Sequence, residues 1–279
     1  MTTQDFIAAA DLSPLESAGL ADFDALWQLE LAAVEHPNTG RGKGWSSVCR
    51  LDLPERSYFL KRQCNHLTRS LTHPFGEPTL AREFRNIRRY AERQVPAIGA
   101  AFFGMRKAAR ERRAILLTPA LLGWRDMSGW LAGWPECPPE RRGELIDACG
   151  LLARRLHAAR LAHGCFYPRH IFVRARERGF TACLIDLEKS RPLHFRRERV
   201  RDVEQFLRYA PQFSEAEIDR FLALYLEAPA NAPEIGHWRQ WLARRQRKKQ
   251  GASPVDVGRQ DGDDQHQHPG QIKPEQENG

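Results

Sequence analysis

The first half of the chain carries short hydrophobic runs that end at turn residues. Runs of this length, joined in pairs by polar or basic turns, predict the strands of a small sheet. The pairs are Val48–Leu53 with Tyr58–Leu60, and Ala100–Met105 with Ala114–Thr118. Between them, residues 79–94 carry apolar side chains at helical spacing and precede Pro96, which predicts one amphipathic helix with an Arg-rich opposite face. Another amphipathic helix is expected over residues 23–34.

Helical periodicity dominates the second half of the chain. The expected helices cover 127–131, 139–160, 200–209, 214–226 and 235–245, and two short strands cover 171–173 and 182–185. Sheet-rich sequence followed by helix-rich sequence indicates an α+β protein with two lobes. The expected divisions are a helical extension over 1–36, a sheet-rich lobe over 37–118, a helical lobe over 119–245 and a disordered tail over 246–279. The tail has too few large apolar residues to offset its ordering entropy.

Composition narrows the class of protein and its partners. The chain has 279 residues, of which 42% are hydrophobic and 28% charged, values typical of a soluble globular protein. Its 43 Lys and Arg against 35 Asp and Glu give a net charge of +8, which favours polyanionic partners. Neither an apolar run of about 18 residues nor a signal peptide is recognisable, so a cytoplasmic location is expected.

The spacing of the cysteines and histidines argues against a disulfide-rich scaffold and against a zinc hydrolase. The six cysteines are scattered without a Cys-x-x-Cys pair, which excludes a disulfide scaffold. His157, His163 and His170 are six and seven residues apart, so they do not form the i, i+4 pair of a zinc hydrolase helix.

Residues that suit phosphate chemistry occur in the sheet-rich half. Gly42, Gly44 and Ser47 lie in a turn where small residues let backbone N–H groups approach a phosphate, although an ordinary hairpin turn has the same composition. Lys61 ends a hydrophobic strand, which would hold its ammonium at a fixed depth for phosphate binding; an edge lysine is the alternative. Glu83 in the following helix would pair with Lys61, unless it is a solvated partner of neighbouring arginines.

The most specific stretches lie in the helical half: His163-Gly-Cys165-Phe-Tyr-Pro-Arg-His170-Ile-Phe-Val and Leu184-Ile-Asp186-Leu-Glu. A polar loop leads into one short strand, and a second strand ends at an aspartate. This layout suits metal and phosphate chemistry, with Asp186 as an oxygen ligand for Mg²⁺ and His170 as a second polar contact. A plain hairpin with Asp186 as a turn residue is the alternative.

Together these stretches resemble the lipopolysaccharide kinase family (the Kdo/WaaP and InaA-like group), from about Gly42 to Tyr209. The resemblance implies a protein-kinase-like bilobal fold, ATP and Mg²⁺ as cofactors, and phosphorylation of a heptose or Kdo sugar of the lipopolysaccharide inner core. The roles that it implies are ATP binding for Lys61 with the Gly42, Gly44 and Ser47 turn, pairing with Lys61 for Glu83, Mg²⁺ binding for Asp186 and His170, and bracing of the catalytic loop for Asp202.

One position departs from the pattern of the family. Cys165 stands where such kinases carry the catalytic-loop aspartate, and a thiol with a pKa of about 8.5 accepts protons poorly at neutral pH. Arg169 or His163 would have to depress that pKa, so Cys165, His163 and Asp186 form the predicted catalytic group. The departure also favours a pseudokinase that binds nucleotide and serves as a regulator or scaffold. A small-molecule kinase of the aminoglycoside or choline type is a further alternative.

The basic segment 189–201 follows Asp186 and is the predicted substrate-facing surface. Its charges suit the lipopolysaccharide core, another anionic glycan, or anionic lipid of the inner membrane in a peripheral contact. A solvated arginine-rich loop is an equal alternative. Nucleic acid is not expected as a partner, because Phe195 is the only aromatic residue in the segment for base stacking.

Overall fold

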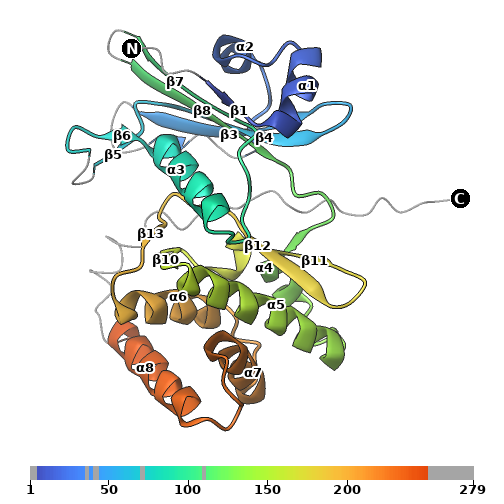
Figure 1. Ribbon diagram of the computed structural model, residues 1–279, viewed down its shortest axis with the longest axis vertical. Helices are drawn as coiled ribbons and strands as arrows, with labels where there is room; N and C mark the ends of the chain where they lie inside the picture. Colours follow the sequence, from blue (N-terminus) through green and yellow to red (C-terminus); the bar gives the residue numbers. More distant parts are fainter. Residues whose placement is uncertain (1–4, 35–37, 40–43, 70–72, 109–110, 251–279) are drawn as a thin grey trace, which may run out of the picture. The chain divides into compact units, whose positions relative to one another are not determined.

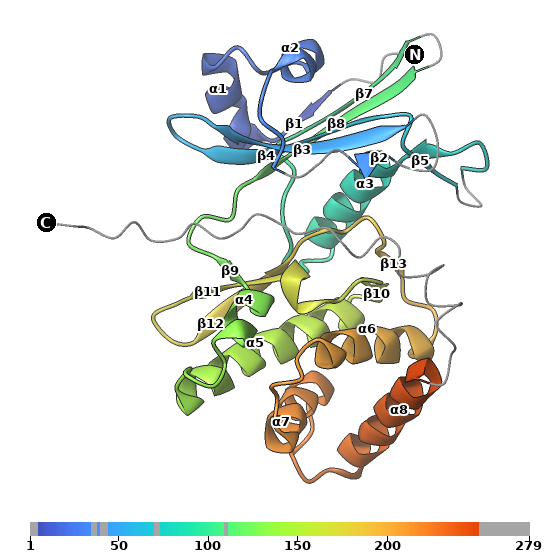
Figure 2. The same cartoon turned by 180° about the vertical axis from the view of Figure 1, so that it is seen from behind.

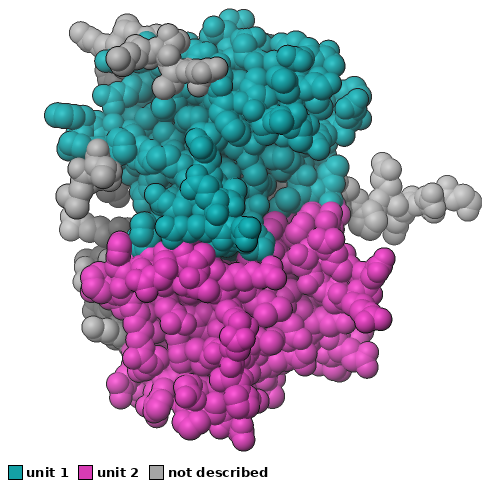
Figure 3. Space-filling view, viewed as in Figure 1, with its two compact units in different colours: residues 1–122, 184–192 teal, residues 123–183, 193–279 magenta. Residues whose placement is uncertain are grey.

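The computed structural model describes residues 5–34, 38–39, 44–69, 73–108 and 111–250 (Figure 1). The chain forms two compact units, which Figure 3 distinguishes by colour. The first comprises residues 1–122 and 184–192, and the second comprises residues 123–183 and 193–279. The segment that carries Asp186 therefore belongs to the same unit as Lys61 and Glu83.

The first unit is built on a six-stranded antiparallel sheet in the order β1-β7-β8-β4-β3-β2. The strands are β1 (Phe6–Ile7), β2 (Asn38–Thr39), β3 (Trp45–Asp52), β4 (Ser57–Cys64), β7 (Phe102–Ala108) and β8 (Glu111–Pro119). The two predicted strand pairs are the hairpins β3–β4 and β7–β8. Lys61 pairs with Val48 on one side and Leu116 on the other, so it lies in the middle of the sheet.

The two faces of this sheet carry different helices (Figures 1 and 2). On one face, α1 (Ala9–Ser17) and α2 (Phe23–Gln28) enclose a core that contains Leu60, Ile115 and Leu117. On the other face lies α3 (Thr79–Glu92). The short strands β5 (Leu67–Thr68) and β6 (Glu77–Pro78) precede α3 in the sequence. Residues 184–192, which return to this unit, contain β13 (Arg191–Pro192). Since successive strand residues point to opposite faces, Leu60 faces α1 and α2, and Lys61 faces α3.

Two details of the N-terminal region differ from expectation. The helix predicted over 23–34 ends at Gln28, because the Arg62 guanidinium donates to the Trp27 and Leu29 carbonyls and the following residues bridge to β3. The region expected as a helical extension also contributes β1 to the sheet, where Phe6 is paired with Phe103.

The second unit consists mainly of helices. They are α4 (Met127–Ala132), α5 (Pro139–Ala158), η1 (Pro168–His170), α6 (Arg196–Arg208), α7 (Glu215–Leu226) and α8 (Pro233–Gln250). Its strands are β9 (Arg125–Asp126), β10 (Leu161–Ala162), β11 (Ile171–Ala175) and β12 (Phe180–Leu184), with β11 between β12 and β9 in one sheet. The apolar stripe of α5 is buried against its neighbours, α7 among them.

The end of α8 extends past the predicted start of the tail. The helix continues to Gln250, because its last residues are strong helix formers although they include few apolar side chains. Residues 251–279 of the predicted tail lie outside the described residues. Within the ranges given above, the helices lack the length and hydrophobicity that crossing a bilayer requires.

Candidate active site

Lys61 and Glu83 form a buried ion pair in the first unit. Strand alternation turns Lys61 toward α3, and Glu83 lies on the buried side of that helix. Lys61 Nζ is 2.8 Å from Glu83 Oε1, with side-chain exposures of 14% and 5%. The predicted pairing of these two residues is present, and it holds the lysine in an extended, fixed position.

The charge of Lys61 is maintained by three carboxylates. Burial alone would lower the pKa of its ammonium, but Glu83, Asp186 and Glu188 together raise that pKa above its ordinary value. Lys61 is therefore protonated throughout the physiological range. A fixed cation of this kind suits the binding of phosphate oxygens.

The segment with Asp186 is fastened to α3 through its backbone. Asn86 Nδ2 donates to the carbonyls of Leu187 at 2.7 Å and Ser190 at 3.0 Å. The Tyr90 hydroxyl and Ser190 Oγ are 2.9 Å apart and share a hydrogen bond. One helix thus positions both the partner of Lys61 and the segment that presents Asp186.

Asp186 has a backbone φ of 55°, in the left-handed region that few residues other than glycine adopt. Such a conformation persists only where neighbouring contacts impose it, and it is common at functional sites. Here Leu184 supplies the constraint just before it, through backbone hydrogen bonds to Pro96 and Ile98.

Asp186 and Glu188 are the acidic neighbours of the Lys61–Glu83 pair. Burial, Asp186 and Glu83 raise the pKa of Glu188 to about 7, although Lys189 and Arg82 act in the opposite direction. Mg²⁺ prefers carboxylate oxygens as ligands. Among the residues that the structure describes, however, no three or more His, Cys, Asp or Glu side chains lie together as a metal site. The metal role of Asp186 stays a prediction, and Glu188 is an acidic neighbour that the sequence did not single out.

Gly44 lies directly before β3, at a point where two backbone segments pack closely. A Cβ on Gly44 would lie 2.5 Å from the Asn65 carbonyl oxygen, so close backbone packing requires glycine there. Ser47 is buried within β3, opposite Arg62. Gly42 lies outside the described residues. The phosphate-binding role of this turn stays a prediction.

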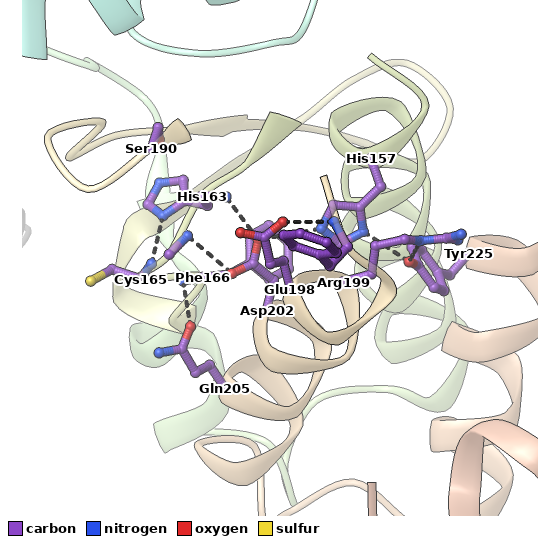
Figure 4. Close-up of polar contacts among 12 residues, drawn as sticks. His157, His163, Cys165, Phe166, Ser190, Glu198, Arg199, Asp202, Gln205 and Tyr225 are labelled. Atoms are coloured by element: carbon purple, nitrogen blue, oxygen red, sulfur yellow. Dashed lines mark hydrogen bonds and ion pairs between the residues drawn. The ribbon is translucent and has the colours of Figure 1, made fainter. Parts of the chain in front are cut away.

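In the second unit, Asp202 of α6 organises the loop that follows β10 (Figure 4). Its Oδ2 accepts the His163 backbone N–H at 2.7 Å, and its Oδ1 accepts that of Gly164 at 3.0 Å. Burial would raise the pKa of Asp202, but the hydrogen bonds from the His157 side chain and the His163 backbone lower that pKa below its ordinary value. The aspartate is ionised and holds the loop by its backbone, as the resemblance implied.

Cys165 lies in the middle of this loop and is 5% exposed. Its backbone N–H donates to His163 Nδ1 at 3.3 Å, which gives the fully buried His163 a role in loop structure. Figure 4 shows the Cys165 sulfur directed away from Asp202. The proposed effect of His163 or Arg169 on this thiol stays a prediction.

His170 is held in one tautomer at the end of η1. Its Nδ1 is 2.8 Å from the Cys165 carbonyl oxygen, which can only accept, so Nδ1 carries the proton. Nε2 then accepts a hydrogen bond from Arg169 Nε at 3.2 Å. A metal-ligating histidine is oriented in the same way by a carbonyl on its other nitrogen. The metal role of His170 stays a prediction, and Mg²⁺ favours oxygen over imidazole.

Several residues that position the site were missed by sequence reasoning. Each is a polar side chain on the buried side of a helix, and that placement is the signal that would have found them. They are Asn86, His157, Gln205 and Tyr225, of which Gln205 accepts the Phe166 backbone N–H at 3.4 Å.

The chain can be placed among known proteins on these features. Residues 24–225 match the lipopolysaccharide kinase (Kdo/WaaP) family. The chain belongs to this family. Protein InaA of Escherichia coli strain K12 is 32% identical over 213 residues, which are 75% of this chain and 97% of that protein.

A solved structure of a lipopolysaccharide kinase family protein has the same fold. It is described as WaaP in complex with acyl carrier protein, and it matches 88% of this chain and 99% of its own with a TM-score of 0.66 and 20% identity. The predicted family and the predicted α+β, protein-kinase-like fold are confirmed. Lipopolysaccharide kinases are phosphotransferases, so membership gives this chain its general class of chemistry.

Proposed function

We propose that this member of the lipopolysaccharide kinase family transfers the γ-phosphate of ATP to a hydroxyl of a heptose or Kdo sugar in the lipopolysaccharide inner core. The observation that carries the proposal is the buried Lys61–Glu83 pair, whose Glu83 lies on the same helix, α3, that fastens the Asp186 segment through Asn86. A structural ion pair alone would not need a strained aspartate and a second acid beside it.

Each residue has a definite role in this proposal. Lys61 binds phosphate oxygens and offsets the negative charge that develops on them, while Glu83 keeps the lysine extended. Asp186 is the principal ligand for Mg²⁺, with His170 as the second predicted ligand. When bound, Mg²⁺ neutralises charge on the phosphate oxygens. The loop held by Asp202 positions Cys165 near the attacking hydroxyl.

Cys165 is the observation that favours the second candidate, a nucleotide-binding pseudokinase. Phosphoryl transfer has a loose transition state and depends mainly on positioning and charge, so a missing base slows it without abolishing it. We therefore expect wild-type protein to transfer phosphate slowly and Cys165→Asp to do so about tenfold faster. The measurement is transfer of labelled γ-phosphate from Mg-ATP to purified lipopolysaccharide core.

Cys165→Ala is the matched control in that assay, because it removes the thiol without adding a base. A wild-type protein that binds ATP but transfers nothing, with activity appearing only in Cys165→Asp, would establish the pseudokinase instead. Aminoglycoside and choline as competing acceptors distinguish the small-molecule kinases. Preferred transfer to either would contradict the lipopolysaccharide core as acceptor.

We further propose a cytoplasmic protein that contacts anionic inner-membrane lipid through the start of α6. Phe195 is 58% exposed, and the Arg197 guanidinium lies over its ring at 4.8 Å. Arg201 is one turn further along, and within the described ranges neither arginine forms an ion pair. An exposed aromatic ring beside uncompensated arginines suits the interface of an anionic bilayer.

The double variant Arg197→Glu/Arg201→Glu should weaken binding to phosphatidylglycerol vesicles by at least about tenfold, since each arginine near an anionic surface contributes roughly 1 kcal/mol. Co-sedimentation in low salt measures it. Arg176→Glu/Arg178→Glu, in the turn after β11, makes the same change of net charge and should bind nearly as wild type. Loss of affinity for soluble core glycan with unchanged vesicle binding would assign the segment to the acceptor sugar instead.

A further inference from the structure

A continuous series of hydrogen-bonded polar groups, buried except for the half-buried Arg199, leads to the loop of Cys165 from three helices of the second unit. His157 lies on α5, Arg199 and Asp202 on α6, and Tyr225 on α7. Asp202 is fully buried and is the residue that accepts the backbone N–H groups of the loop. The orientation of its carboxylate therefore sets the orientation of the loop.

His157 provides a side-chain contact to Asp202 Oδ2, the same oxygen that accepts the His163 backbone N–H. His157 Nε2 is 3.3 Å from Asp202 Oδ2, and a carboxylate can only accept, so Nε2 carries the proton. His157 Nδ1 and the Tyr225 hydroxyl are 2.8 Å apart and share a hydrogen bond. Contacts on both ring nitrogens thus fix the orientation of the imidazole.

Tyr225 is in turn held by Arg199. Arg199 Nε donates to the Tyr225 oxygen at 2.8 Å. Burial raises the pKa of Tyr225 to about 12, which keeps the hydroxyl protonated. Arg199, Tyr225, His157 and Asp202 are therefore joined by consecutive hydrogen bonds.

Packing holds the Tyr225 ring independently of its hydroxyl. The ring lies edge-on to His157 at 5.5 Å and to Trp238 at 5.0 Å, with the Arg199 guanidinium over it at 5.3 Å. Removal of the hydroxyl alone therefore leaves the aromatic contacts intact. This separation of packing from hydrogen bonding makes the role of the hydroxyl testable.

We propose that Tyr225, held by Arg199, is a positioning residue that acts through His157 and Asp202 to orient the loop carrying Cys165. The inference rests on the proposed function for its effect on turnover. Its effect on the loop itself does not depend on which acceptor is used. These hydrogen-bonded residues supply no reacting group. Their contribution is to keep the loop in the geometry that transfer requires.

Tyr225→Phe should lower kcat by about tenfold, the value of one buried hydrogen bond, with the affinity for Mg-ATP changed less than about twofold. Amide hydrogen exchange at His163 and Gly164 should become faster, because their acceptor carboxylate is no longer held. Tyr209→Phe is the matched control, since it removes a hydroxyl from a tyrosine of the same unit that is 46% exposed. It should change neither quantity.

Two further variants separate positioning from folding. His157→Gln keeps one donor toward Asp202 and one acceptor toward Tyr225, and should retain more activity and more amide protection than His157→Leu. Arg199→Met keeps the contact with the ring and should reproduce a weaker form of Tyr225→Phe. Thermal unfolding identifies any variant that has lost its fold.

Unchanged exchange at His163 and Gly164 in folded Tyr225→Phe would overturn the inference, whatever the activity. Faster exchange with unchanged kcat would also overturn it, because the loop would then not need this support. If wild-type protein transfers no phosphate to any acceptor, the proposed function fails, and the exchange measurement still decides whether Tyr225 orients the loop.

Discussion

Replacement of Asp186 by asparagine is expected to reduce phosphoryl transfer by about a thousandfold while leaving the fold intact. Asparagine keeps the size of the side chain and one oxygen, but it removes the negative charge that would hold Mg²⁺ in the proposed site. The backbone bonds from Asn86 to Leu187 and Ser190 do not involve the carboxylate, so the segment should stay fastened to α3. The loss would then arise from chemistry and not from unfolding.

The measurement is the initial rate of labelled phosphate transfer with the Mg²⁺ concentration varied. Asp24→Asn, on the exposed side of α2, is the matched control and should transfer at the wild-type rate. Partial recovery at high Mg²⁺ would indicate that metal affinity is what the variant lost. Full activity of Asp186→Asn at all concentrations would remove Asp186 from the mechanism.

Lys61→Met should have the second large effect, a loss of transfer of at least about a hundredfold together with a loss of stability of about 3 kcal/mol. The stability falls because Glu83 is left buried without its cation, beside Asp186 and Glu188. Activity falls because no fixed positive charge remains for the phosphate oxygens. Urea unfolding and the transfer assay measure the two effects separately.

The double variant Lys61→Met/Glu83→Leu tells the two roles apart. Removal of both charges should restore most of the stability, since an apolar pair of similar volume commonly replaces a buried ion pair without loss. It should restore none of the activity. Wild-type transfer by either variant would show that Lys61 does not contact the phosphates.

The Lys61–Glu83 pair was predictable because it follows from local periodicity. Strand alternation fixes the face that Lys61 occupies, and helical spacing puts Glu83 on the buried side of the next element. The contact from Asn86 to Leu187 was not predictable in this way, because it joins residues 101 positions apart. No local pattern encodes such a partner.

Other differences between the predicted and the observed structure also have specific physical causes. Apolar spacing continues past Gln28, but the Arg62 guanidinium binds the carbonyls of Trp27 and Leu29 that a longer helix would use. The two residues of β1 are too few for a periodic signal. Tyr225 was assigned to a helix by its spacing, yet its hydroxyl has partners on two other helices, which only the tertiary fold brings together.

The return of residues 184–192 to the first unit has a consequence for synthesis of the chain. Residues 1–122 emerge from the ribosome first. Their partners in the returning segment are Leu187, which binds Asn86, and Leu184, which binds Pro96 and Ile98. These partners follow residue 122 by more than sixty positions. Until then the Asn86 amide has no acceptor from that segment. The first unit therefore reaches its final structure only after the intervening sequence of the second unit, residues 123–183, has been made. A fragment that stops at residue 122 would lack both Asp186 and the contacts that hold it.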